Sequence, residues 1–169
     1  MKRTFVILFL VLNSLNLFSQ KEANIWHFGN GFSLNFNSGQ AVQESGSAIS
    51  TIEGSTSYCD SAGNLLFYSN GGGRIPAAGQ STGRIWNRNN EVMYDMQGLE
   101  GGGFSAAQSS VIVPAPGVNK VYYLFTMEEA EFYVDSAVAA EPFGRGLRYF
   151  KIDMNQWSGR SNRSRCTCL

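Results

Sequence analysis

The sequence predicts an all-β protein built from antiparallel hairpins. Its 169 residues include 19 glycines and 13% aromatic but only 15% charged residues, which is typical of a folded, turn-rich β chain. Short apolar runs alternate with turn signals such as Asn70-Gly71. One strand–turn–strand plan also occurs twice along the chain. The length is sufficient for one domain with a hydrophobic core.

Residues 1–20 have the organisation of a secretory signal peptide. Lys2 and Arg3 supply its positive start, residues 5–12 its apolar centre, and residues 13–20 a more polar exit. The apolar run is too short for a stable bilayer span. We therefore expect an exported mature chain without a transmembrane anchor, located in the periplasm, at the cell surface or outside the cell.

The first predicted element of the mature chain is a hairpin. Apolar and polar residues alternate over 24–28 and again over 32–36, with a glycine-containing turn between them. Such a pattern gives a hairpin one buried face. Residues 40–51 are interpreted as a polar link that contains a short strand at 48–51.

The central unit consists of a β-prone run at residues 56–59, a turn at 60–64 and an apolar strand at 65–69. The turn is expected because Asp60 can accept hydrogen bonds from the backbone ahead of it and Gly63 can adopt positive φ. The apolar strand shows no alternation, which predicts burial on both of its faces.

A second tight hairpin is predicted at residues 84–93, and the plan then repeats. Residues 108–113 and 121–126 are strands separated by a Pro-Gly turn, and residues 147–154 form an outer strand. The second of these strands follows the apolar strand of the central unit at an offset of 57 residues. This period predicts that residues 21–155 form an incomplete β-propeller of about two blades plus the N-terminal hairpin.

So short a propeller would leave apolar strands covered on one side only. Residues 65–68 and 122–125 are the strands concerned. Because exposed sheets of this kind favour pairing with other chains, we expect the chain to associate or to pack incompletely.

Two other segments are less regular. The glycine run at residues 101–103 has no Lys-Ser/Thr after it, so it is interpreted as a flexible surface loop rather than a phosphate-binding loop. Residues 128–141 place apolar side chains at helical spacing with acidic residues in the first turn, which predicts a short helix. A strand at residues 131–135 is the alternative.

Charge and cysteine content exclude several classes of function. The formal net charge is zero, but five of the thirteen basic residues lie near the two ends, so the central body is mildly acidic and nucleic-acid binding is not expected. The three cysteines, Cys59, Cys166 and Cys168, do not make a disulfide framework. Cys59 is expected to be a small buried strand residue.

Five motifs, taken together and in order, resemble a known group of proteins: NIWHFG at 24–29, DSAGNLLFYSNG at 60–71, IWNRNNEVM at 85–93, QSSVIVPAPG at 108–117 and YYLFT at 122–126. The chain resembles the N-terminal β-propeller region of large exported proteins of Bacteroidetes-type bacteria, which often end in a gliding-motility-associated, type IX (type B) sorting domain. The resemblance implies a secreted or surface-attached propeller followed by further blades or adhesion-like domains, and it implies no catalytic residues. This chain departs from the group because it has no sorting domain and stops where further blades are expected.

The composition changes abruptly at the end of the chain. Residues 156–169 contain three arginines, three serines and two cysteines, without strand or helix periodicity. We interpret them as a disordered tail that is out of frame; a functional basic tail is the alternative.

The sequence contains no catalytic constellation, and we expect no catalytic residues, no metal site and no cofactor. His27 is the only histidine and lies on an alternating strand, so a structural role is expected. Trp86 and Arg88 are the candidate ligand-binding residues, because an aromatic platform beside a guanidinium suits sugar rings and acidic polysaccharides. In the alternative interpretation Trp86 packs between blades and Arg88 is solvated.

The leading hypothesis is a non-catalytic exported module for surface binding or display, as a fragment of a larger adhesion-like or motility-associated protein. Its partners would be polysaccharides or cell-surface components. The alternative is a truncated part of an exported carbohydrate-active enzyme that uses Glu53 or Asp153. A truncated product without a function of its own is the third reading.

We predict that the signal peptide is removed on export. The intact mass of the exported protein should be lower than that of the full chain by the mass of about twenty residues. A mature protein that still begins at Met1 would contradict this prediction.

Overall fold

The computed structural model describes residues 20–72, 83–98, 100–102, 106, 108–128 and 146–156. These residues contain ten strands in three antiparallel sheets and no helix, which confirms the predicted all-β class. The helix or strand predicted within 128–141 lies outside the described residues, apart from Glu128. So do residues 1–19 and 157–169, with Cys166 and Cys168.

The first sheet has the strand order β1-β2-β3 and contains the predicted N-terminal hairpin. Its strands are β1 (Ile25–Phe28), β2 (Asn30–Asn35) and β3 (Val42–Ser50). β3 is a nine-residue strand, so the short strand predicted at residues 48–51 is present at 48–50, whereas the polar link predicted before it was wrong from Val42 onward. Its first five residues are exposed and it pairs with β2 through the backbone, so its sequence carries no apolar alternation.

The middle sheet is a four-stranded meander in the order β4-β5-β6-β7. Its strands, β4 (Thr56–Cys59), β5 (Leu65–Ser69), β6 (Arg84–Asn87) and β7 (Val92–Asp95), agree with the predicted hairpins. In the turn between β6 and β7, Asn90 adopts the left-handed conformation with φ of 64°.

The third sheet repeats the plan with β8 (Ser110–Pro114), β9 (Val121–Met127) and β10 (Leu147–Asp153). Its order, β10-β9-β8, confirms the predicted pairing of the second unit. Each of the three sheets is therefore a meander of sequential antiparallel neighbours.

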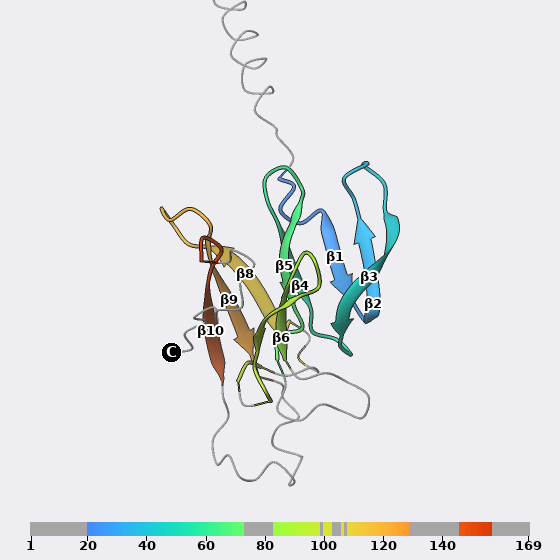
Figure 1. Cartoon of the computed structure of the whole chain (residues 1–169). Coiled ribbons are helices and arrows are strands. Elements are labelled where there is room, and N and C mark those ends of the chain that lie inside the picture. Colours follow the sequence, from blue (N-terminus) through green and yellow to red (C-terminus); the bar gives the residue numbers. More distant parts are fainter. Residues whose placement is uncertain are drawn as a thin grey trace, which may run out of the picture.

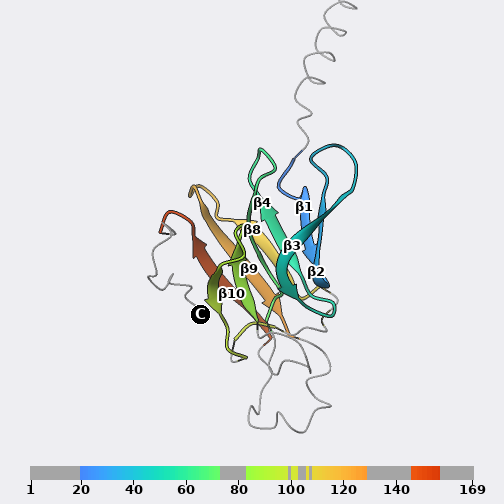
Figure 2. The same cartoon turned by 45° about the vertical axis from the view of Figure 1, so that its right-hand side comes forward.

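The three sheets lie side by side in chain order, with the first sheet blue to teal, the middle sheet green to yellow-green and the third sheet gold to red (Figure 1, Figure 2). The first strands of the sheets adjoin, since β1 packs beside β4 and β4 beside β8. Within the described residues the sheets do not close into a ring. The middle sheet therefore has a neighbour on each side, whereas the first and third sheets have one neighbour each.

Two hydrophobic clusters fill the interfaces between the sheets. One joins the middle and third sheets around Phe67, Leu124 and Phe150, all of which are fully buried. The other joins the first and middle sheets and includes Ile49 and Cys59, so the predicted burial of Cys59 is confirmed. The expectation that residues 65–68 are covered on one side only was wrong, because β5 contributes to both clusters.

Tyr68 organises the interface between the first and middle sheets. Its ring stacks on Trp86 with centroids 5.3 Å apart and contacts His27 at 4.4 Å. Its hydroxyl donates to Asn90 Oδ1 at 2.5 Å and accepts from the Ala48 amide at 3.0 Å. One buried phenol thus connects β3 to the turn between β6 and β7.

The glycine run was predicted to be a surface loop, but Gly101 and Gly102 are buried. Gly101 forms a bridge with Gly72, and a Cβ on Gly102 would lie 2.0 Å from the Met127 carbonyl oxygen. Glycine is required at these positions because two backbone segments approach so closely that a side chain would not fit. The glycines therefore serve close packing and not the flexibility of an exposed loop. Gly103 lies outside the described residues.

We predict that acidification destabilises the protein through His27. Burial lowers the pKa of the imidazole below its ordinary value of 6.5, against the smaller opposing effects of the Glu44 carboxylate and the Phe32 backbone. Because the unfolded chain then binds the proton more readily, stability should be complete above pH 6.5 and should fall as the pH drops toward the lowered pKa.

Urea unfolding from about pH 8 to about pH 5 measures this loss, and the variant His27→Gln should show a flatter profile. The chain has one histidine, so one imidazole NMR signal reports the titration directly. A midpoint at or above 6.5 in the folded protein would be evidence against the prediction.

Candidate functional site

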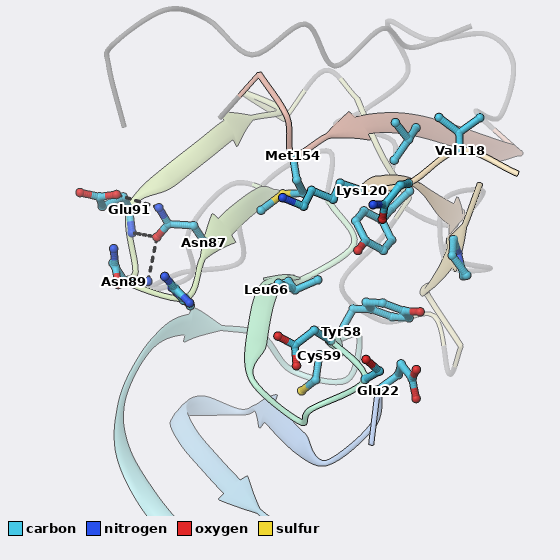
Figure 3. A pocket seen from close by; sticks show the side chains of 17 residues that line it. Glu22, Tyr58, Cys59, Leu66, Asn87, Asn89, Glu91, Val118, Lys120 and Met154 are labelled. Atoms are coloured by element: carbon cyan, nitrogen blue, oxygen red, sulfur yellow. Dashed lines mark hydrogen bonds between the residues drawn. The ribbon is translucent and has the colours of Figure 1, made fainter. Parts of the chain in front are cut away.

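A cleft of about 640 Å³ opens between the middle and third sheets, at the end where three turns gather (Figure 3). The turns are those between β4 and β5, between β6 and β7, and between β8 and β9. In Figure 3 the Asn87, Asn89 and Glu91 side chains lie on one side of the cleft and Lys120 and Val118 on the other.

The turn between β4 and β5 is held by the Asp60 side chain. Its Oδ1 accepts hydrogen bonds from the amides of Ala62 and Asn64, both at 2.9 Å, and the Asn64 side chain donates to both carboxylate oxygens. Gly63 has φ of 88°, and its carbonyl accepts from Asn37 Nδ2 at 2.9 Å. The hydrogen bonds from Asn64 above all lower the pKa of Asp60, so it carries a charge at neutral pH at the rim of the cleft.

The turn between β6 and β7 presents Arg88 and Asn89 to the cleft. Asn87 closes this turn because its Oδ1 accepts from the amides of Asn89 at 2.8 Å and Glu91 at 3.0 Å. Asn87 also donates from Nδ2 to Glu91 Oε2 at 2.7 Å. The Arg88 side chain is exposed, whereas its backbone amide donates to Leu66 on the neighbouring strand. A backbone fixed by this hydrogen bond therefore carries a solvent-exposed set of guanidinium donors.

Lys120 faces the cleft from the turn between β8 and β9. It adopts φ of 59°, a conformation that is uncommon for residues other than glycine. The Lys120 carbonyl accepts from the Met154 amide at 2.9 Å, and the Asn119 carbonyl accepts from Asn155 Nδ2 at 3.3 Å. The end of β10 thus supports the turn that positions the ammonium group.

Two tyrosines form the aromatic part of the cleft. The rings of Tyr58 and Tyr122 lie 5.1 Å apart, and both contact Phe67 beneath them. Burial raises the pKa of both phenols, and nearby acids raise it further: Glu22 for Tyr58 and Asp60 for Tyr122. Both hydroxyls are therefore protonated at neutral pH and can donate hydrogen bonds.

Glu22 supplies an acceptor to the same cleft. Its Oε2 atom is buried and has no hydrogen-bond partner in the described part of the chain. A buried carboxylate oxygen of this kind gains stability from a donor that enters the cleft.

The wall of the cleft contains a cysteine thiol beside aromatic and polar side chains. Cys59 lies in its wall, but burial raises the pKa of the thiol, so the nucleophilic thiolate is disfavoured. In the described ranges no group of three or more His, Cys, Asp or Glu side chains could hold a metal ion. Aromatic rings beside amide, ammonium and guanidinium donors suit a ligand with several hydroxyl groups.

The structure separates the two predicted ligand-binding residues. Arg88 lines the cleft, whereas Trp86 is 2% exposed and packs on Tyr68 in the other interface. The prediction that Trp86 and Arg88 bind a ligand together remains to be tested by binding measurements. Sequence reasoning missed Tyr58 and Tyr122, whose one signal was their position close to predicted turns.

The two carboxylates named for the enzymatic alternative lie far apart. Glu53 is in the loop before β4. The next residue, Gly54, lies against Ser109, which comes directly before β8, so Glu53 is near the beginning of β8. Asp153 pairs with Val121, beyond the other end of β8. The five residues of β8 span about 13 Å, which exceeds the separation of the paired carboxylates of glycosidases.

No family model, no curated protein and no solved structure matches the chain. In the described part of the chain, no helix has the length and apolar character to cross a membrane.

We predict that ionised Asp60 stabilises the fold. Because its pKa is lowered in the folded state, this contribution should be complete above the ordinary value of 3.8 and should be lost as the pH falls through the lowered pKa. Asp60→Asn keeps an acceptor but removes the charge, so at pH 7 it should lower the melting temperature by roughly 2–4 °C.

Thermal melts from about pH 7 down to about pH 2.5 test this, with Glu53→Gln in an exposed loop as the control. The difference between wild type and Asp60→Asn should shrink below pH 3.8. Parallel profiles over the whole range would show that the charge makes no contribution.

Proposed function

We propose that the protein is a non-catalytic carbohydrate-binding module. The observation that carries this proposal is the cleft, in which the Tyr58 and Tyr122 rings lie among the hydrogen-bonding groups of Arg88, Lys120 and Glu22. Sugar rings present apolar faces to aromatic side chains and hydroxyl groups to polar ones, so they match both parts of this lining.

The mixed charge of the cleft favours neutral or weakly charged polysaccharides as ligands. Three acids, Glu22, Asp60 and Glu91, and two basic residues, Arg88 and Lys120, line it. Neither sign dominates, so a strongly acidic polymer would meet repulsion as well as attraction. Arg88 and Lys120 can still bind an isolated carboxylate or sulfate of a glycan.

We propose that the three sheets are blades of a propeller-like array, an architecture that suits a binding role. Three sequential meanders whose first strands adjoin are what a radial array of blades requires. Such an array places turns together at one end, where they form ligand sites.

We propose that the chain is exported and acts at the cell surface or outside the cell, consistent with the composition of residues 1–20. We further propose that it works as part of an adhesion-like or motility-associated protein.

The test is a glycan array probed with the protein expressed from its full-length sequence, followed by calorimetric titration of each polymer that binds. Tyr122→Ala and Arg88→Ala should each weaken binding by roughly tenfold, because an aromatic or charged contact contributes about 1–2 kcal/mol.

Matched controls exist for both variants. Tyr94 packs against the same hydrophobic cluster as Tyr122 but does not line the cleft, so Tyr94→Ala should retain affinity. Arg84 pairs with Asp95 outside the cleft and serves as the control for Arg88. Absence of binding to every polymer, or equal losses in variants and controls, would refute the proposal, and turnover of a glycan would favour the enzymatic alternative.

A further inference from the structure

The outer face of the third sheet is largely apolar, and no other sheet of the described residues packs on it. The register aligns its outward side chains in cross-strand rows, in which Val111 lies opposite Phe125 and Phe125 opposite Tyr149. Tyr123, Phe125 and Tyr149 contact one another at centroid distances of 5.8 to 6.2 Å. Val111 remains 45% exposed and Leu147 64% exposed. We call this surface the third-sheet outer face; its apolar residues are Val111, Val113, Tyr123, Phe125, Met127, Leu147 and Tyr149, and the exposed Lys151 lies opposite Tyr123 at one end.

The first sheet carries a similar surface on the side away from the middle sheet. Because His27 and Ser33 are buried toward the middle sheet, the alternating residues Trp26, Phe28 and Phe32 lie on the opposite side. Trp26 is 51% and Phe32 50% exposed. We call this surface the first-sheet outer face; its apolar residues are Trp26, Phe28, Phe32, Leu34 and Phe36, and the exposed Gln43 and Ser45 of β3 continue it opposite Leu34 and Phe32.

A cavity adjoins the first-sheet outer face at its β1 edge. This cavity of about 510 Å³ is lined by Trp26, Phe28 and Leu34, by His27, and by residues 55–57 at the start of β4 in the middle sheet. A space of this size and apolar lining can receive bulky side chains such as those of the third-sheet outer face.

We propose that two copies of this chain associate head to tail, with the third-sheet outer face of each copy packed on the first-sheet outer face of the other. The two contacts are related by a twofold axis and close the six sheets into one ring. The contact repeats an arrangement that each chain already contains twice, namely one sheet packed face to face on the next with their first strands adjoining.

The arrangement of the first strands indicates that a second copy of the chain covers the two outer faces. β1, β4 and β8 form a row, and its two ends, β1 and β8, lack a further neighbouring first strand among the described residues. A second copy supplies its β8 beside β1 and its β1 beside β8. One kind of contact then covers all four exposed faces, as closed symmetric assemblies require.

The number of sheets also agrees with ring closure. Two copies of the three sheets that the described residues form make six, which lies within the four to eight blades typical of propellers, whereas three sheets are too few and nine are too many. This inference goes beyond glycan binding and does not rest on it, since the cleft lies between the middle and third sheets of one copy.

The first test is the mass of the protein in solution, expressed from its full-length sequence and measured by light scattering and sedimentation. We expect a discrete species of twice the mass of the processed chain, at most about twice the 18.5 kDa of the full chain. A monomer at tens of micromolar would overturn the proposal and would assign the faces to another occupant. An open series of larger oligomers would overturn ring closure.

Variants then identify the faces. Val111→Asp and Phe32→Asp place a charge on the third-sheet and the first-sheet outer face respectively, and each should raise the dissociation constant of the dimer by roughly tenfold or more. The matched control is Val92→Asp, because Val92 has the same exposure of 45% but lies on β7 of the middle sheet. Folding of each variant is checked by circular dichroism, and a variant that fails to fold is replaced by Val113→Asp or Phe28→Asp.

Mixing the two variants distinguishes head-to-tail association from a dimer in which both copies use the same outer face. A mixed dimer of Val111→Asp and Phe32→Asp keeps one unmodified contact, so it should form more tightly than either variant with itself. If only one of the two variants dissociates, the dimer uses one face alone and the head-to-tail proposal is wrong.

Discussion

The rest of the structure depends on covering both faces of the middle sheet. Phe67 and Tyr68 are neighbours in β5 and are both fully buried, yet they belong to different hydrophobic clusters. Because successive side chains of a strand point to opposite faces, this pair requires a second sheet on each side. Burial of each ring contributes about 2–3 kcal/mol, and the order of the three sheets follows from that requirement.

The buried hydroxyl of Tyr68 connects this packing to the cleft. A phenol in an apolar interface must find hydrogen-bond partners, and Tyr68 finds them in the Ala48 amide and the Asn90 side chain. Asn90 belongs to the turn that presents Arg88, so the contact between the first and middle sheets also positions one wall of the cleft. The geometry of the cleft is therefore set by both interfaces, although the cleft lies at only one of them.

The local pattern of the sequence predicts the hairpins, because turn residues and apolar runs act over a few positions. Asp60, Gly63 and Asn90 all occupy predicted turns. Most of β3, from Val42 to Ser47, was missed because an exposed strand segment that pairs only through its backbone leaves no apolar alternation. The cleft was also missed, since Tyr58 and Tyr122 belong to different sheets and no periodicity indicates their contact. Burial of Trp86 agrees with the structural interpretation of that residue.

The two apolar strands of the repeated plan show why composition alone does not determine burial. β5 and β9 occupy equivalent second positions in their sheets, and both have aromatic residues without strict alternation. β5 is covered on both faces, whereas the outward Tyr123 and Phe125 of β9 pack on each other and on Tyr149 within their own sheet. Aromatic side chains on both faces of a strand are costly to leave in water, because apolar surface contributes about 25 cal/mol per Å² when it is buried. A strand with this composition is stabilised fully only when its second face also meets a sheet, and in the head-to-tail pair that sheet comes from the other copy.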